Sequence, residues 1–451
     1  MKNEFTRFLL IAVVMVALIT VISPVSATDW PQFQFNIAST GNSPADAPDN
    51  NTIKWISDDI GAVEGSQAMI IGDKVFVYAN DNIYALNRSY GTVLWNTTIP
   101  GDEMAWGSWV SPAYDNNVIY ISTGFNITKI NAQDGTKLQE VAFPNAGYAC
   151  NGGPTVADGM VFVGSGGNNY YALDENDLTT VIWNYTVPIS GSSSTPAIAD
   201  GKVVVGELTW AGSSHLCCID EFTGAQIWAT ELPGNIGGSA SIDAANDRTY
   251  IVVSTDYTGD AGEIYALNFT TGDVVWNNTI TYSDSTPVIS GDYLYVSGGV
   301  NTPGITYCYD RSGTLQWTVP HGSWTMSPAV ADGKLFTGDI APWGTSDGIY
   351  VFDAITGTPV WSYEHAGSSP SIACPDPIVV SVGNDSKVYA FGTKCYDWKE
   401  GWFGEGSDGG TSITTSELQD AIHHWLDDLD VRGYIMSTKD LQEIISAWLS
   451  S

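Results

Sequence analysis

The chain has 451 residues, with 16 Lys or Arg against 50 Asp or Glu, and a formal net charge of −34. A hydrophobic fraction of 43% is enough for a sizeable core, which excludes wholesale disorder. The acidic excess argues against nucleic acid and anionic lipid as partners, because phosphates need Lys and Arg to neutralise them. The composition permits a protein that binds cations, sugars or neutral polymers.

Residues 1–27 are predicted to be a secretory signal peptide. Lys2 and Arg7 precede an apolar run over residues 8–22, and small residues at 25–27 provide a cleavage site. An uncleaved anchor is the alternative, although the run is short for a spanning helix. Cleavage would leave a mature net charge of −35. No second apolar segment of spanning length follows, so we expect a secreted or cell-surface protein without an integral membrane span.

Asn-x-Ser/Thr sequons are frequent and fit an exported glycoprotein in a host that glycosylates. The candidate glycosylation sites are Asn50, Asn87, Asn96, Asn126, Asn184, Asn268, Asn277 and Asn384.

A period of about 45 residues organises the middle of the chain. Each repeat holds a short strand that begins near a Pro, an alternating apolar strand, a third strand of the type Ile83-Tyr84-Ala85-Leu86, and a fourth strand that carries a Trp. Turns that open with Asp or Asn and close with Gly separate the last two strands. Four antiparallel strands at a fixed spacing are typical of a β-propeller.

Counting the third strands gives eight units, of which the last ends at Phe391 without its Trp strand. An orphan strand around Trp55 stands upstream of the first unit, so we expect residues 50–57 to complete the eighth blade and close the ring. Unit two departs from the pattern, with Leu138 in place of the Trp. The sequence therefore predicts an all-β, eight-bladed propeller of four-stranded antiparallel blades over residues 28–393.

These repeats resemble the pyrroloquinoline-quinone-like (PQQ-like) propeller repeats of quinoprotein dehydrogenases and of bacterial outer-membrane assembly propellers. The opening Asp29-Trp30-Pro31-Gln32-Phe33, with Thr40-Gly41, is similar to the start of such propellers. The resemblance covers residues 29–393 and implies the fold. It leaves function open, because enzymes and scaffolds both use this repeat.

The chain then changes character. Residues 394–411 are rich in Gly and read as a linker, and residues 412–451 contain a helical repeat with an offset of 23 residues. A capping box opens each copy, as in Thr414 with Glu417. Leu, Ile and Trp at spacings of three and four place one apolar face on each helix, so two helices should pack together.

This duplicated loop and helix resembles a dockerin, a family whose loops bind calcium through carboxylates. The resemblance implies that the module docks a protein partner, with candidate calcium ligands Asp428, Asp430 and Asp440. Arg432 stands where another ligand is expected, and the first loop is poorer in carboxylates. We therefore expect an α-helical pair that folds without metal, with calcium binding as the alternative.

The sequence contains few of the residue patterns that mark catalytic or cofactor sites. Some quinoprotein dehydrogenases carry a disulfide between adjacent cysteines against their cofactor, but Cys217-Cys218 falls inside a predicted third strand, where successive side chains point to opposite faces. The His residues show no metal-ligand spacing, and no nucleophile or phosphate-binding motif is present. We expect no PQQ, no other cofactor and no catalytic residue.

One face of the propeller collects aromatic residues. The connections between second and third strands and between blades share a face, because alternate turns of an antiparallel blade lie on opposite sides, and loops carry function more often than blades. The ligand-binding residues predicted for this face are Trp106, Trp109, Tyr148, Trp210, Tyr257, His321, Trp324 and Trp343. Some of these rings, such as Trp109 and Trp324, could instead plug the channel.

The sequence favours an exported, non-catalytic binding or assembly scaffold at the cell surface. Its ligand would be a surface protein or a neutral glycan, because the acidic charge disfavours anions. The alternative is a PQQ- and calcium-dependent alcohol or sugar dehydrogenase, which would need carboxylates aimed into the channel.

Overall fold

The chain divides into two compact units, Met1–Gly392 and Thr393–Ser451. The computed structural model describes residues 28–79, 81–100, 110–123, 125–143, 152–189, 191–192, 194–209, 212–300, 304–339, 347–393, 415–426, 430–431, 434–435, 441–442, 444–445 and 448. The predicted signal peptide and linker lie outside these residues.

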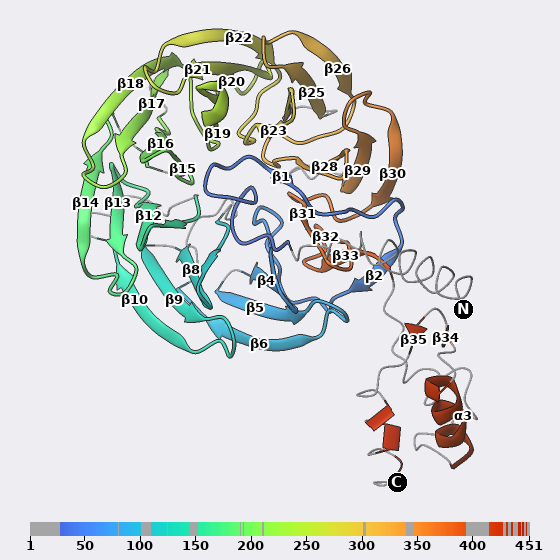
Figure 1. Ribbon diagram of the computed structural model, residues 1–451. Helices are drawn as coiled ribbons and strands as arrows, with labels where there is room; N and C mark the ends of the chain where they lie inside the picture. Colours follow the sequence, from blue (N-terminus) through green and yellow to red (C-terminus); the bar gives the residue numbers. More distant parts are fainter. Residues whose placement is uncertain are drawn as a thin grey trace, which may run out of the picture. The chain divides into compact units, whose positions relative to one another are not determined.

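The first unit is a ring of eight blades, each built on four antiparallel strands (Figure 1). The four strands follow chain order in seven blades, and in the eighth the early strand β2 lies outermost. The innermost strands are β3 (Met69–Ile71), β7 (Ala113–Asp115), β11 (Thr155–Ala157), β15 (Ala197–Ala199), β19 (Ser241–Asp243), β23 (Val288–Ser290), β27 (Ala329–Ala331) and β31 (Ser371–Ala373). The second strands are β4 (Lys74–Ala79), β8 (Val118–Thr123), β12 (Met160–Gly164), β16 (Lys202–Gly206), β20 (Arg248–Asp256), β24 (Tyr293–Gly298), β28 (Lys334–Gly338) and β32 (Ile378–Val382).

The outer half of each blade completes the sheet. The third strands are β5 (Asn82–Asn87), β9 (Asn126–Asn131), β13 (Asn169–Asp174), β17 (Ser213–Asp220), β21 (Ala261–Asn268), β25 (Ile305–Asp310), β29 (Gly348–Asp353) and β33 (Val388–Gly392). The fourth strands are β6 (Val93–Thr98), β10 (Lys137–Ala142), β14 (Val181–Thr186), β18 (Gln226–Pro233), β22 (Val274–Ile280), β26 (Leu315–Val319), β30 (Pro359–Glu364) and, for the eighth blade, β2 (Ile53–Ile56). A short 3-10 helix, η1 (Ala244–Asn246), follows β19.

The ring closes as the sequence predicts. Strand β2 pairs antiparallel with β33, with Trp55 opposite Ala390. The Trp55 indole Nε1 donates to the Arg88 carbonyl of blade one at 2.7 Å, and its ring covers Gly91 so closely that a Cβ there would lie 2.4 Å from the indole. Trp183 makes the same contacts with the next blade, so these Trp residues lock neighbouring blades together.

The structure of blade two corrects the prediction that Leu138 takes the place of the Trp. The residue in register with the Trp is Gln139, which pairs with Lys129, whereas Leu138 occupies a β-bulge beside it. The Gln139 amide donates to Asp177 at 2.8 Å and accepts from the Leu178 amide at 3.0 Å. Gln139 therefore replaces the indole bond to the next blade with two amide bonds.

The N-terminal segment, residues 28–41, runs inside the ring and bonds to the exposed inner edges of the blades (Figure 1). Thr28 exchanges backbone hydrogen bonds with Cys374, and Trp30 does the same with Ile70. The carbonyls of Ile37, Ala38, Thr40 and Gly41 then accept from blades four to seven in turn at 2.6–2.9 Å. Strand β1 (Asn42–Ser43) next adds parallel to β27.

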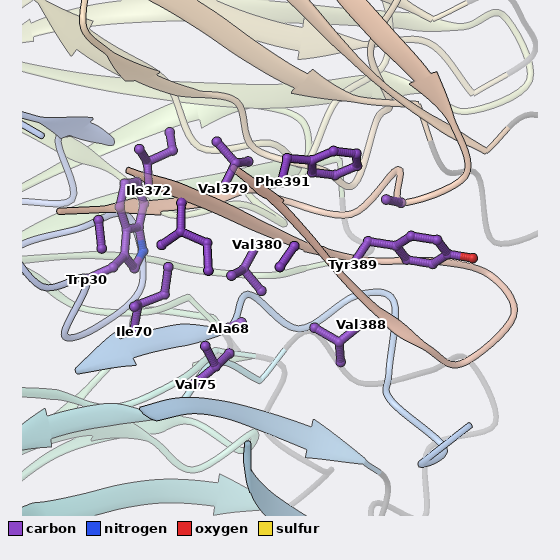
Figure 2. Close-up of a cluster of buried hydrophobic side chains, with 14 of the residues drawn as sticks. Trp30, Ala68, Ile70, Val75, Ile372, Val379, Val380, Val388, Tyr389 and Phe391 are labelled. Atoms are coloured by element: carbon purple, nitrogen blue, oxygen red, sulfur yellow. The ribbon is translucent and has the colours of Figure 1, made fainter. Parts of the chain in front are cut away.

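We call residues 28–41 the inner clasp, and the burial of apolar side chains strengthens its attachment to the blades. The Trp30 side chain is fully buried beside Ile70 and Ile372, in a cluster that also contains Phe391 of the last blade (Figure 2). The segment therefore joins the first and last blades through both hydrogen bonds and apolar packing.

A second belt of hydrogen bonds links consecutive blades where each inner strand begins. The amide of one blade donates to a Ser or Thr hydroxyl of the next at the same position, at 2.8–3.2 Å. The accepting hydroxyls belong to Ser111, Thr195, Ser239, Thr286, Ser327 and Ser369. Several precede the Pro of the repeat, which explains why Ser-Pro and Thr-Pro recur there.

The C-terminal unit contains α3 (Thr415–Leu426) and a small hairpin, β34 (Asp430–Val431) with β35 (Tyr434–Ile435). Leu418 and Ala421 of α3 are buried with Leu441 and Ile444 of the second sequence copy. The described residues of the two sequence copies therefore share one apolar cluster, whereas a dockerin-like pair of helices stays a prediction. Within the described part of the chain, no helix has the length and apolar character needed to span a membrane.

Candidate functional site

Antiparallel pairing sends alternate connections of each blade to opposite faces of the ring. We call the face with the connections between second and third strands and between blades the loop face. The opposite face carries the turns between first and second and between third and fourth strands, and we call it the turn face.

The predicted aromatic residues fall into two groups. Trp106, Trp109, Tyr148, Trp210 and Trp343 lie outside the described residues. Tyr257, His321 and Trp324 are described and all belong to loop-face connections. Trp324 is only 6% exposed, so its ring fills space between loops, whereas Tyr257 is 45% exposed.

Three rings from adjacent blades form an aromatic cluster. Tyr257 meets the edge of Tyr282 at 5.3 Å between centroids and of Trp324 at 6.2 Å, and Tyr282 meets Trp324 at 5.6 Å. Such edge-to-face contacts are attractive because the positive ring edge faces the negative ring centre. Tyr257 is the exposed member of this cluster, whereas Tyr282 and Trp324 are both buried.

Two aspartates hold Tyr257 in this position. The Asp256 carboxylate accepts from the amides of Thr258 and Gly259, both at 3.0 Å, which closes a tight turn around Tyr257. Asp260 accepts from the amides of Tyr282 and Val300 at 3.2 and 3.0 Å, and thus ties this loop to two others. The exposed ring is therefore presented on a fixed support.

Asp284 lies beside the cluster, on the connection into blade six. Its amide donates to the Trp324 carbonyl at 2.6 Å, and one carboxylate oxygen lies 3.2 Å from the Ser254 hydroxyl. Burial raises the pKa of Asp284 to about 7, although the Ser254 hydroxyl acts in the opposite direction. This carboxyl group can therefore gain or lose a proton near neutral pH.

Sequence reasoning missed Asp284, although a signal was present. Asp284 stands two residues before the belt residue Thr286, where blade five has Gly237 and blade eight has Gly367. A Cβ on Gly237 would lie 2.4 Å from the Asp284 carboxyl carbon, so the small residue of one blade makes room for the carboxylate of the next. An acid at a position where blades one, five and eight have glycine (Gly65, Gly237 and Gly367) could have been recognised.

Each His of the propeller pairs with a carboxylate on the loop face. His215 lies 2.7 Å from Glu207, His321 lies 3.5 Å from Asp339, and His365 lies 3.6 Å from Asp347. The His321 ring also stacks on Tyr350 at 3.6 Å between centroids. The carboxylates of the last two pairs lie at the two ends of the connection between β28 and β29. No group of three or more His, Cys, Asp or Glu among the described residues could hold a metal ion.

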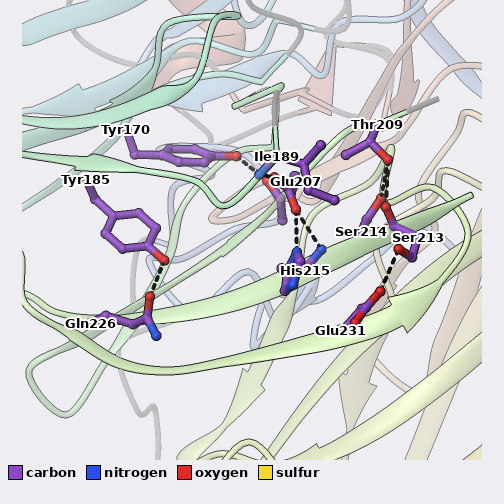
Figure 3. A network of polar contacts seen from close by, with 11 residues as sticks. Tyr170, Tyr185, Ile189, Glu207, Thr209, Ser213, Ser214, His215, Gln226 and Glu231 are labelled. Atoms are coloured by element: carbon purple, nitrogen blue, oxygen red, sulfur yellow. Dashed lines mark hydrogen bonds and ion pairs between the residues drawn. The ribbon is translucent and has the colours of Figure 1, made fainter. Parts of the chain in front are cut away.

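Glu207 shows how such a pair supports a loop (Figure 3). Its side chain is fully buried and accepts from the amides of Ile189 and His215 as well as from the His215 ring. Because a buried carboxylate is stable only when hydrogen-bonded, Glu207 fixes the start of the connection between β16 and β17.

The adjacent cysteines do not suit the quinone site that the fold suggests. Cys217 packs into the core shared by blades three and four, whereas Cys218 packs into the core shared by blades four and five. Both thiols are free and fully buried, and burial raises the pKa of each to about 12. Their side chains lie on opposite faces of β17, so they cannot present a disulfide to the channel.

The predicted calcium ligands and glycosylation sites also lie partly within and partly outside the described residues. Of the calcium candidates, Asp428 and Asp440 lie outside the described residues, and Asp430 begins β34. Among the sequons, Asn96, Asn184 and Asn277 share one exposed position, directly after the Trp of a fourth strand. Asn268 instead donates its amide to Asp247 at 2.6 Å. Glycosylation remains a prediction.

Comparison with known proteins adds the family. The chain matches the family described as outer membrane protein assembly factor BamB over residues 79–297 and 302–394. The chain belongs to this family. This BamB-family chain is 30% identical over 333 residues to a tetrathionate hydrolase of Acidithiobacillus ferrooxidans, covering 70% of this chain and 54% of the hydrolase. It is 24% identical over 271 residues to BamB of Salmonella typhimurium, covering 55% of this chain and 65% of that protein.

Among solved structures, the BamB-family chain is similar to a quinohemoprotein alcohol dehydrogenase from Comamonas testosteroni. The TM-score is 0.68 at 13% identity, covering 81% of this chain and 80% of that chain. At this identity the likeness shows the propeller fold alone. The chain spans about half to two thirds of the curated relatives' lengths.

Proposed function

We propose that this protein is an exported, non-catalytic binding or assembly scaffold whose ligand binds the loop face. The observation that carries the proposal is the exposed Tyr257 ring, held by Asp256 and Asp260 over a buried aromatic pair. A rigid aromatic side chain loses little entropy on binding and offers flat apolar area, as binding hot spots do. The name of the family, an assembly factor of the outer membrane, supports a role outside the cytoplasm.

The C-terminal unit would act as a docking element. Its paired helical segments bury Leu418 and Leu441 together, which supports an independently packed module. The dockerin-like reading and a calcium requirement stay proposals, to be tested below.

The test compares two tyrosines with the same exposed fraction. Tyr257→Ala should weaken binding to a native envelope fraction by about 5- to 150-fold, the equivalent of roughly 1–3 kcal/mol. Tyr90 is also 45% exposed but lies on the turn face, so Tyr90→Ala should bind as the wild type does. Equal binding by a folded Tyr257→Ala variant would move the site elsewhere.

A PQQ- and calcium-dependent alcohol or sugar dehydrogenase is the second candidate. Asp284 favours it, because a carboxylate with a pKa of about 7 suits a general base. The positions of Cys217 and Cys218 speak against it. Addition of PQQ and calcium should give no dye-linked turnover of alcohols or aldoses, and turnover that disappears in Asp284→Asn would establish the enzyme.

A further inference from the structure

The outer strands of blades one, three and five carry the same modification motif at the same place. In each, an Asn-x-Thr sequon begins directly after the Trp of the fourth strand, and both its Asn and its Thr are exposed. Each Asn stands opposite a Tyr of the third strand, so the three positions are structurally equivalent. The propeller thus repeats one exposed acceptor site around its circumference. The sequons are Asn96 with Thr98, Asn184 with Thr186, and Asn277 with Thr279.

The other sequons have different surroundings. Asn87 and Asn268 are half-buried and cap turns, with side-chain oxygens that accept from turn amides at 2.8–3.1 Å. Asn126 is also half-buried, and its sequon ends on a fully buried Thr. Asn50 and Asn384 are exposed but lie in connections between strands. Because an N-linked oligosaccharide is bulky and needs a surface position, the three half-buried sequons suit the folded propeller less well than the outer-strand ones.

An exposed aliphatic side chain accompanies each outer-strand Asn. Leu94 is 45% exposed, Ile182 is 42% exposed and Val275 is 44% exposed. Each lies two residues before its Asn, on the same side of the strand, because side chains alternate. The separation along the strand is about 7 Å. A sugar ring attached to the Asn amide can span this distance and cover the aliphatic side chain.

These strands are also the outer edges of their blades. An exposed edge with aliphatic side chains invites pairing with another chain, and proteins protect such edges with charge or by covering them. Blade two uses charge, because Glu140 takes the Asn position and forms an ion pair with Lys137 at 2.6 Å. Blades one, three and five have a neutral Asn there, which gives neither kind of protection unless it carries a larger polar group.

We propose that Asn96, Asn184 and Asn277 carry N-linked oligosaccharides, which cover the neighbouring aliphatic side chains and the outer edges of blades one, three and five. The inference goes beyond the proposed function and shares with it only the expectation of export. The sugar donor is an oligosaccharide joined through its anomeric carbon to a phosphate of a lipid carrier. The Asn Nδ2 bonds to that carbon and releases one proton. The bond from the carbon to the phosphate oxygen breaks, and its electron pair stays with the phosphate.

Mass spectrometry of glycopeptides tests the sites, with intact protein recovered from outside the cytoplasm of its native cells. We expect sugar on the three outer-strand asparagines and unmodified asparagines at the three half-buried sequons. Thr186→Ser keeps the sequon and the donor of the 2.7 Å bond to Asn169, so Asn184 should stay modified, whereas Thr186→Ala should lose the sugar.

Two results would overturn the inference. One is the absence of sugar from the outer strands, and the other is equal modification of the half-buried sequons. The scaffold function would survive either result, because ligand binding through Tyr257 is measured separately.

Hydroxyl-radical labelling tests whether the sugars cover the strand. It compares the native glycoprotein with a variant that combines Asn96→Gln, Asn184→Gln and Asn277→Gln, whose fold circular dichroism confirms. Leu94 and Ile182 should be labelled about twofold more strongly in the variant, because a bulky glycan shields nearby side chains from solvent.

Two neighbouring blades supply matched controls. Leu138 and Ile227 are 48% and 43% exposed and occupy the same bulge position in blades two and four. Glu140 and Ala229 replace the Asn there, so the labelling of these control side chains should not change. Equal labelling of Leu94 and Ile182 in the two proteins would show that the sugars do not cover the strand.

Discussion

The two faces of this propeller use their carboxylates in opposite ways. On the turn face an Asp at each of several turns accepts hydrogen bonds from Thr or Ser and from backbone amides, which lowers its pKa. These residues are Asp73, Asp134, Asp177, Asp220, Asp247, Asp310 and Asp353. The largest cause is a bond from Lys74 for Asp73 and a bond from Gln139 for Asp177.

On the loop face burial instead raises the pKa values of Asp284, Asp347 and Glu64. Burial outweighs the hydrogen bonds of Asp284 and Asp347, and the charge of Asp347 raises the pKa of Glu64 further. Exceptions exist on both sides. Asp256 caps a loop-face turn, and burial beside Asp158 raises the pKa of Glu221 on the turn face to about 7. The contrast teaches that one residue type supports the fold where donors surround it and remains available to a ligand where they do not.

Both faces belong to one ring of blades, which the inner clasp holds together. Removal of the clasp should therefore give the largest loss of stability. Deletion of residues 28–41 removes the backbone bonds to Cys374, Ile70 and the inner strands of blades four to seven. At about 1 kcal/mol per bond, plus loss of the buried Trp30, we expect a fall of several kcal/mol in the free energy of unfolding. Urea unfolding measures it. An unchanged midpoint would show that the blades hold together without the clasp.

The second-largest loss of stability is expected when a Trp that joins two neighbouring blades is removed. Trp183→Ala removes an indole that covers Gly224 and donates to the Glu221 carbonyl, and should cost about 3–5 kcal/mol. Tyr90→Ala serves as the surface control and should stay within about 0.5 kcal/mol. A Trp183→Ala variant as stable as the control would mean that other contacts join these blades.

The two classes of carboxylate should differ in the sign of their pH dependence. The pKa of Asp284 is raised to about 7, so the unfolded chain is ionised before the folded one and stability falls as pH rises from about 4 to about 7. Asp284→Asn should remove that loss and be neutral or stabilising at pH 8. Thermal unfolding across this range measures the change, and a marked destabilisation at pH 8 would contradict it.

Asp353 should behave in the opposite way. Bonds from Thr356 lower its pKa, so it stabilises the fold above its unfolded pKa and loses this effect as pH falls below about 4. Asp353→Ala should cost about 1 kcal/mol at neutral pH, since the turn loses its acceptor. Equal stability of variant and wild type at pH 7 would argue that solvent satisfies this turn equally well.

The smallest effect is expected in the C-terminal unit. Its helical segments pack through Leu418, Ala421, Leu441 and Ile444. We therefore expect a calcium chelator to leave the protease resistance of this unit unchanged in the intact protein. Rapid cleavage with chelator that calcium reverses would show that the loop carboxylates, including Asp430, bind the ion.

Much of the fold follows from local pattern. The repeat of Pro, alternating strand and Trp defines the blades, because strand period and turn chemistry act over a few residues. The sequence predicted the ring closure because Trp55 lies in a fourth strand that has no other strands of its blade beside it in the chain. An exposed sheet edge is costly, so this strand was expected to complete the last blade. The same local logic placed Cys217 and Cys218 on opposite faces of a strand.

What the sequence by itself determined was the eight-bladed ring, its closure and the face on which Tyr257 lies. The tertiary structure decided the path of residues 28–41 through the ring, the register that puts Gln139 in place of a Trp, and the surroundings of Asp284. Each of these depends on groups far away in the chain, such as Gly237 beside Asp284 and Asp177 beside Gln139. Local propensity cannot report such contacts, because the burial and the hydrogen-bond partners of a side chain exist only once the blades have assembled.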